Sequence, residues 1–135
     1  MAPRYMLDTN ISSAVIKGNI PAVRAKLRSI PMTDICVSAV TAGELLYGAV
    51  KRGEKTRLAV AIQEFLLRTD VLPWDQDTAV RYGAVRAELE RNGKSLGNLD
   101  MMIAAHALAA GAVMVTNDQA FRHVVQLELA DWTKP

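Results

Sequence analysis

The sequence has one cysteine, few aromatic residues and no long hydrophobic run, and each scarcity excludes a class of protein. The single cysteine, Cys36, cannot form an intramolecular disulfide, so this is not a disulfide-stabilised scaffold. The most apolar stretch, 101–115, contains His106 and Gly111 and is shorter than the roughly 18 residues that indicate a membrane helix. No secretory signal is visible, because the chain turns polar at Asp8. We therefore expect a cytoplasmic protein with no membrane segment.

Several well-known site motifs are also missing. The sequence contains no glycine-rich phosphate loop of the P-loop or dinucleotide type and no Gly-x-Ser-x-Gly nucleophile motif. His106 and His123 have no cysteine or histidine at metal-ligand spacing, which argues against a zinc site.

The composition is that of an ordinary globular protein. Of the 135 residues, 50% are hydrophobic and 22% are charged, which predicts one domain spanning residues 1–135. The formal net charge of +2 is compatible with a polyanionic partner but does not establish one.

Short apolar runs alternate with segments of helical periodicity. The runs predict buried strands at 5–7, 35–37, 70–72, 112–115 and 127–132, and the periodicity predicts helices at 11–17, 21–28, 39–51, 55–68, 76–91 and 99–110. This alternation predicts an α/β fold: a three-layer α/β/α sandwich around a central, mostly parallel sheet of four or five strands. We also expect Leu46 to pack inward with Leu45, and Asn98 to cap the last of these helices.

Four acids occupy positions that such a fold can bring together. Asp8 and Asp118 each follow a predicted strand, while Glu44 and Asp100 lie near helix starts. Ligands of open α/β sheets bind at the carboxyl ends of the strands. Two unscreened carboxylates ~4 Å apart repel by on the order of 4 kcal/mol at an effective dielectric near 20, so the cluster needs a cation or bound protons. Oxygen-only ligands favour Mg²⁺ or Mn²⁺, which support phosphodiester hydrolysis.

Each acid also has a purely structural explanation. Asp8 or the neighbouring Asn10 can cap a helix, and Thr41 with Glu44 matches a capping box. Asp100 suits a first helical turn, and Asp118 can cap the turn that follows it. These residues alone leave both readings open.

Taken together, the motifs resemble PIN-domain ribonucleases, in particular the VapC toxins of bacterial toxin–antitoxin pairs. The similarity lies in Met6-Leu7-Asp8-Thr9-Asn10 and in the stretches 37–49, 85–94, 97–107 and 115–118 with Phe121, and it covers nearly the whole chain in one order. The resemblance implies a PIN-like sandwich and a Mg²⁺- or Mn²⁺-dependent endoribonuclease. The acids Asp8, Glu44, Asp100 and Asp118 would be its catalytic and metal-binding residues, with Asn10 and Thr116 as supporting polar groups.

The resemblance also suggests substrates and partners. The stretch 85–107 is similar to VapC toxins that cut initiator tRNA in its anticodon stem-loop, leaving 5′-phosphate and 3′-hydroxyl ends. Four basic residues are candidates to grip the RNA backbone: Lys51, Arg86, Arg91 and Lys94. The apolar helical hairpin 39–67 predicts a homodimer, and the family implies a VapB-type antitoxin seated on the same region.

Two other classes stay open at this point. A non-catalytic, RNA-binding PIN-fold protein would use the acids only as caps. A phosphotransfer domain also places acids after its first strand. A haloacid-dehalogenase fold, however, needs a second Asp where Asn10 stands, and a receiver domain needs a later lysine that does not occur between Val115 and Lys134.

Overall fold

The computed structural model describes residues 3–135, which fold around a five-stranded sheet in the order β3-β2-β1-β4-β5. All four neighbouring strand pairs are parallel, so the predicted α/β class with a parallel sheet is confirmed. The strands are β1 (Tyr5–Leu7), β2 (Ile35–Ser38), β3 (Asp70–Leu72), β4 (Val113–Val115) and β5 (Leu129–Ala130).

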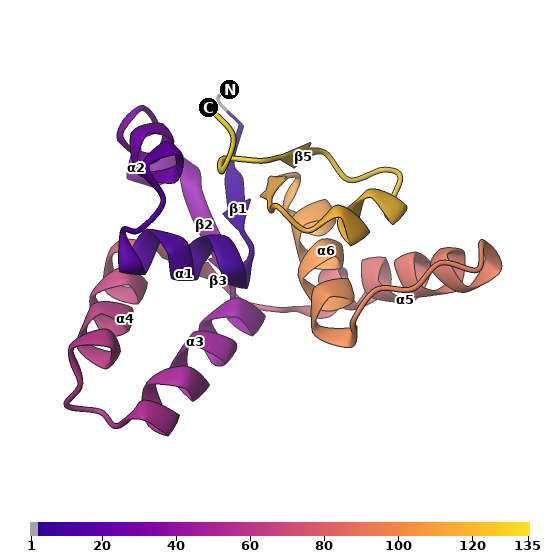
Figure 1. Ribbon diagram of the computed structural model, residues 1–135. Coiled ribbons are helices and arrows are strands. Elements are labelled where there is room, and N and C mark those ends of the chain that lie inside the picture. The colour runs from indigo at the N-terminus through magenta and orange to yellow at the C-terminus, as the bar shows by residue number, and fades with distance from the viewer. Residues whose placement is uncertain (1–2) are drawn as a thin grey trace.

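Helices cover both faces of the sheet and produce the predicted three layers. Figure 1 shows α1, α2 and α4 on one side, α5 and α6 on the other, and α3 leading away from the end of β2 alongside α4. The helices are α1 (Thr9–Lys17), α2 (Pro21–Arg28), α3 (Ala39–Arg52), α4 (Arg57–Arg68), α5 (Gln76–Arg91) and α6 (Asn98–Ala110), with 3-10 turns at Met32–Asp34 and Gln119–His123. None of the helices within residues 3–135 is long and apolar enough to cross a bilayer.

Alternate residues of the central strands point into two separate cores. Met6 and Met114 pack with the apolar side chains of α5 and α6, whereas Leu7 and Val115 pack with Ile11 and the other face. All of these are buried, which explains why the strands read as continuous apolar runs instead of alternating ones. The predicted buried cysteine, Cys36, lies in the first core, and burial raises the pKa of its thiol to about 11.

Several local expectations were wrong. Asn98 is the first residue of α6 and makes no cap; Gly97 precedes the helix without a side-chain hydrogen bond. Leu46 is 37% exposed instead of packed inward, because the buried stripe of α3 passes through Leu45 and Ala49. The first helix starts at Thr9, two residues earlier than expected, because Asp8 caps it.

The order of the strands places a crevice beside β1. From β1 the chain builds outwards through β2 and β3, then returns to place β4 on the other side of β1. The carboxyl ends of β1 and β4 therefore flank the point where the order reverses, which is where open α/β sheets bind ligands. The two strand ends are joined directly, since the backbone N–H of Asp8 donates to the carbonyl of Val115 at 3.0 Å.

Candidate active site

Asp8 is the first residue beyond β1, and only 3% of its surface is exposed. Its Oδ1 accepts the backbone N–H of Ile11 at 2.8 Å and so caps α1. Its carboxylate is also hydrogen-bonded to the side chain of Thr116, beyond β4. The Asp8 side chain can therefore cap α1 and belong to the candidate site at the same time.

Burial raises the pKa of the Asp8 carboxyl above its ordinary value. The hydrogen bonds from Thr116 and Ile11 act in the opposite direction and lower it, while the charges of Asp118 and Glu44 raise it further. The ionised form of Asp8 is thus disfavoured by its surroundings, which is common at functional sites.

Glu44 lies within α3 and does not close a helix start. The residue that caps α3 is Ser38, whose Oγ accepts the N–H of Val40 at 3.1 Å, so the expected capping box of Thr41 and Glu44 is absent. The Glu44 side chain instead reaches α1, where the Thr9 hydroxyl donates to Glu44 Oε1 at 2.6 Å. Thr9 also lies 3.3 Å from the hydroxyl of the buried Thr41.

Asp100 is half-buried in the first turn of α6. The pKa of its carboxyl is raised, first by burial and then by the charges of Asp118, Glu44 and Asp8. No hydrogen bond from residues 3–135 contributes to this shift, unlike at Asp8. Asp100 therefore lacks the hydrogen-bond donors that partly offset the raised pKa of Asp8.

Asp118 lies three residues beyond the end of β4 and is exposed. As expected, it caps the following turn, with Oδ1 accepting the N–H of Ala120 at 2.9 Å. The Thr116 Oγ accepts the N–H of Asp118 at 3.0 Å, so Thr116 connects Asp8 and Asp118. Asn10 is exposed on α1 and lines a pocket of about 210 Å³ together with Glu44.

The fold thus brings acids from four separate stretches of the chain to one edge of the sheet. Burial is the first cause of the raised pKa values of Asp8 and Asp100; the charges of Asp118 and Glu44 raise both further, and the charge of Asp8 also raises the pKa of Asp100. Within residues 3–135, however, no three His, Cys, Asp or Glu side chains form a ready-made metal-binding group. Carboxylates with no cation between them repel one another, which favours such a spread arrangement. The donors are all oxygens, a set that suits a hard divalent cation such as Mg²⁺ or Mn²⁺.

Four basic residues that the sequence did not single out share a pocket with one of the acids. Lys17 and Arg52 line the pocket that holds Glu44, and Arg122 and Lys134 line one of about 180 Å³ that holds Asp118. No local pattern distinguishes these four from other surface cations, so the sequence analysis missed them.

The four expected RNA-binding residues line neither of these two pockets: Lys51, Arg86, Arg91 and Lys94. All four are exposed, and Arg86 is hydrogen-bonded to Tyr82 and Glu90 of its own helix. Figure 1 shows that the carboxyl end of α5, where Arg91 lies, projects away from the sheet.

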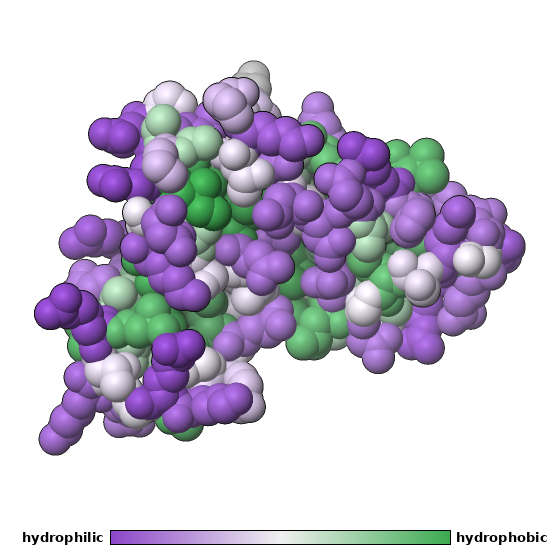
Figure 2. All heavy atoms as spheres, in the orientation of Figure 1, coloured by the Kyte–Doolittle hydropathy of each residue, from purple (hydrophilic) through white to green (hydrophobic). Residues whose placement is uncertain are grey.

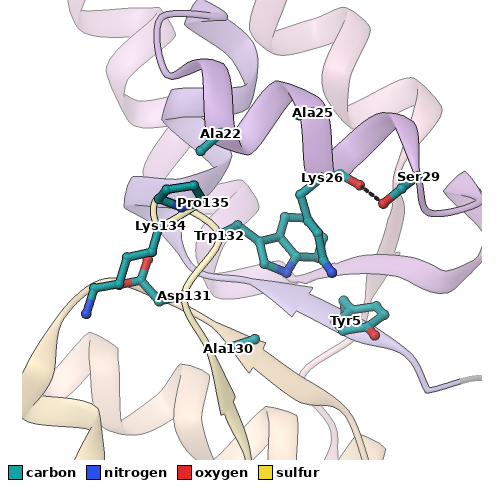
Figure 3. Close-up of a pocket in the computed structure, with 10 residues that line it drawn as sticks. All are labelled: Tyr5, Ala22, Ala25, Lys26, Ser29, Ala130, Asp131, Trp132, Lys134 and Pro135. Atoms are coloured by element: carbon teal, nitrogen blue, oxygen red, sulfur yellow. Dashed lines mark hydrogen bonds between the residues drawn. The ribbon is translucent and has the colours of Figure 1, made fainter.

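A larger pocket, of about 620 Å³, lies between α2 and the C-terminal segment (Figure 3). Tyr5 and Trp132 form part of its wall, with ring centroids 5.4 Å apart. None of the four acids lines it. Size alone therefore does not identify the site, and the chemistry favours the carboxyl edge.

Comparison with known proteins identifies the family of the chain. Residues 5–127 match the PIN domain family. The chain is 40% identical over 131 residues to the tRNA(fMet)-specific endonuclease VapC of Shigella flexneri, covering 96% of this chain and 98% of the relative. It is 36% identical over 130 residues to the ribonuclease VapC2 of Haemophilus influenzae, with the same coverage.

Solved structures are similar too. The crystal structure of VapBC2 from Rickettsia felis bound to a promoter DNA fragment has a chain that matches with a TM-score of 0.86 and 32% identity, covering 95% of this chain and 98% of that one. The DNA-bound VapBC of Salmonella typhimurium gives a TM-score of 0.85 and 34% identity, covering 97% of this chain and 99% of that one. The fold, the acids and these matches agree: the chain belongs to the PIN-domain family, in its VapC ribonuclease branch.

Proposed function

We propose that this protein is a divalent-metal-dependent endoribonuclease, the toxin of a toxin–antitoxin pair, using Mg²⁺ or Mn²⁺. The observation that carries the proposal is the electrostatic effect of acids that come from separate elements of the fold. Burial raises the pKa values of Asp8 and Asp100, and the charges of Glu44 and Asp118 raise both further, although these residues are far apart in sequence. Without a cation, repulsion among these acids lowers the stability of the folded protein. We infer that the acids are retained because the activity needs them.

Asp8, Glu44, Asp100 and Asp118 are the residues that would hold the cation. When bound, a divalent ion neutralises these carboxylates and supplies Lewis acidity for phosphodiester hydrolysis. The chain's own contribution is to orient the acids. Thr9 fixes Glu44, and Thr116 bonds to Asp8 and to the backbone of Asp118.

One of these carboxylates would act as the base that accepts a proton from the attacking water. Asp100 is our candidate for this role, because the Asp8 carboxylate already accepts the N–H of Ile11 at 2.8 Å, whereas no hydrogen bond within residues 3–135 contributes to the pKa shift of Asp100. The basic residues Lys17, Arg52, Arg122 and Lys134 lie around the acids and would attract the RNA backbone.

For the substrate we propose initiator tRNA, cut in its anticodon stem-loop. The support is the 40% identity to a protein named as a tRNA(fMet)-specific endonuclease. A single-stranded loop can present unstacked bases and an accessible backbone, which a duplex cannot.

For the partner we propose a VapB-type antitoxin, because the similar chains of Rickettsia felis and Salmonella typhimurium were solved as VapBC complexes. The family match disfavours the phosphotransfer alternative, because residues 5–127 match the PIN domain instead.

The test is cleavage of RNA by the purified chain, freed of any partner. We expect cleavage with Mg²⁺ or Mn²⁺, none with EDTA, and 5′-phosphate ends that can be sequenced. Asp8→Ala and Asp100→Ala should abolish it, and initiator tRNA should be cut faster than elongator tRNAs. Unchanged cleavage by both variants would refute the enzyme proposal and favour the RNA-binding alternative. Equal rates on all tRNAs would refute only the choice of substrate.

A further inference from the structure

His106 makes a buried hydrogen bond that involves none of the four acids of the site. Its Nδ1 lies 2.7 Å from Oγ of Ser38, which is 68 positions earlier in the chain. His106 is 3% exposed and Ser38 is fully buried. Ser38 is the last residue of β2 and the cap of α3, while His106 lies in the middle of α6. The bond therefore connects α6 to the start of α3.

The hydrogen bonds around this pair form a consistent network. Burial lowers the pKa of His106, and Asp75 and a backbone hydrogen bond with Pro73 act against this shift. In a neutral imidazole, one nitrogen donates to the Pro73 carbonyl and Nδ1 accepts from the Ser38 hydroxyl. Ser38 Oγ in turn accepts the N–H of Val40. Both ring nitrogens and the hydroxyl are thus satisfied, as a buried polar group requires.

Glu44 and Asp100 lie equally far along their helices from the hydrogen bond between His106 and Ser38. Glu44 follows Ser38 by six positions along α3, and Asp100 precedes His106 by six positions along α6. At ~1.5 Å per residue, each acid is about 9 Å of helix from the bond. Helix α3 leads away from the carboxyl edge of the sheet, and α6 runs back past that edge towards β4 (Figure 1). Both acids therefore lie on the same side of the bond, beyond the sheet.

We propose that His106 is a positioning residue, whose bond to Ser38 braces α3 against α6 and so sets the separation of Glu44 from Asp100. The brace is needed because the acids repel: the charge of Glu44 is among those that disfavour ionised Asp100. Without it, the two helix starts can relax apart and the cation ligands separate. This inference rests on the proposed metal-dependent function.

The alternative is that His106 simply fills the core. A core residue affects stability, whereas a brace also affects the affinity of the acids for a cation. Groups that orient metal ligands typically change metal affinity by about 10–100-fold when mutated. The two roles can therefore be separated by measuring both quantities on the same variants.

Three substitutions at His106 retain different hydrogen bonds of the imidazole ring. His106→Asn places an amide near the position of Nδ1 and can keep the Ser38 bond. His106→Gln reaches the position of Nε2 and can keep only the Pro73 bond, and His106→Leu keeps neither. Thr69→Val is the control, because Thr69 is a buried residue whose hydroxyl donates a part-buried hydrogen bond to the Phe65 carbonyl at 2.7 Å, at the end of α4.

The first measurement is Mn²⁺ affinity, from the electron paramagnetic resonance signal of free Mn²⁺, with each variant well below its melting temperature. We expect His106→Leu and His106→Gln to bind at least about 10-fold more weakly than the starting protein. His106→Asn should recover most of the affinity, and Thr69→Val should retain it. Steady-state cleavage should show the loss in kcat more than in KM. Unchanged Mn²⁺ affinity in His106→Leu would overturn the proposal.

The second measurement needs no metal and no activity. In EDTA at low salt, Asp100→Asn should raise the melting temperature, because it removes repulsion. If His106 holds the acids together, this gain should be smaller in the His106→Leu background, where the helices have already relaxed. Equal gains in both backgrounds would refute the brace. Failure of the starting protein to bind Mn²⁺ would refute the proposed function, with the brace still judged by these melting temperatures.

Discussion

The Thr9 hydroxyl lies 2.6 Å from Glu44 Oε1, across 35 positions of the sequence. Thr9 is the first residue of α1 and immediately follows Asp8, so this bond ties the third helix to the residue next to the buried acid. Hydrogen bonds to charged groups contribute roughly 1.5–3 kcal/mol. One hydroxyl therefore fixes where the Glu44 carboxylate points relative to Asp8.

Removing the Thr9 hydroxyl should lower activity without unfolding the protein. Thr9→Val keeps the shape of the side chain but releases Glu44, and we expect metal-dependent RNA cleavage to fall by about 10-fold or more. Thr9→Ser keeps the hydroxyl and serves as the control, with a rate near that of the unmodified chain. Equal rates for the two variants would show that the bond does not matter.

Neutralising Asp8 should stabilise the metal-free protein. Since its folded pKa is raised, the folded state binds more protons than the unfolded state between the ordinary value of 3.8 and the raised one. Stability therefore decreases as the pH rises through that window, and the full penalty is present at neutral pH. Asp8→Asn keeps an oxygen to cap α1 and removes the charge.

Thermal unfolding in EDTA measures this effect. At pH 7 we expect Asp8→Asn to unfold at a higher temperature than the unmodified protein, with the advantage disappearing below the ordinary carboxyl pKa. The same variant should lose RNA cleavage. A melting temperature that is lower than that of the unmodified protein at pH 7 would contradict the prediction.

The cations beside the acids should matter more for RNA binding than those at the end of α5. Arg52→Ala and Arg122→Ala should raise KM and reduce the slope of log affinity against log salt, by about 0.7 for each lost contact with a single strand. Arg91→Ala and Lys94→Ala, outside the two acid-lined pockets, are the matched controls. Larger effects in the α5 variants would instead support the residues expected from the sequence.

The exposed apolar face of α3 and α4 should mediate the predicted homodimer. Val50 is 68% exposed and Leu67 is 82% exposed, and Figure 2 shows hydrophobic surface over the region of α4. Val50→Lys should shift the protein to monomers in sedimentation velocity. Val80→Lys, at a valine 70% exposed on the opposite side of the sheet, should not. A monomeric starting protein would disprove the dimer.

Much of the fold was predictable because its signals are local. The buried strands are short apolar runs, and Pro21, Asp75 and Gly111 mark helix ends that the structure reproduces. Asp8 and Asp118 were predictable because a residue after a parallel strand must lie at the carboxyl edge. The predicted topology also allowed Glu44 and Asp100 to reach this edge, but only the resemblance to a family favoured a site over a structural role, since a first-turn or mid-helix acid has many structural explanations.

The tertiary contacts of the site could not be predicted in the same way. In the sequence, His106 is a histidine in an apolar helix with no zinc partner, and its bond to Ser38 spans 68 positions that no periodicity connects. The sequence also does not indicate that Arg52 and Arg122 share pockets with the acids. Arg52 lines its pocket from the end of α3, and Arg122 lines its pocket from the 3-10 turn at Gln119–His123.

The amino-acid sequence by itself determined the strands, the helices and the presence of an acid after β1 and after β4, because apolar runs and turn-forming residues act within a few positions. Only the tertiary structure decided that Thr9 orients Glu44, that Thr116 connects Asp8 with Asp118, and that His106 joins α6 to α3. These relations arise because the sheet order reverses at β1 and brings distant segments of the chain together.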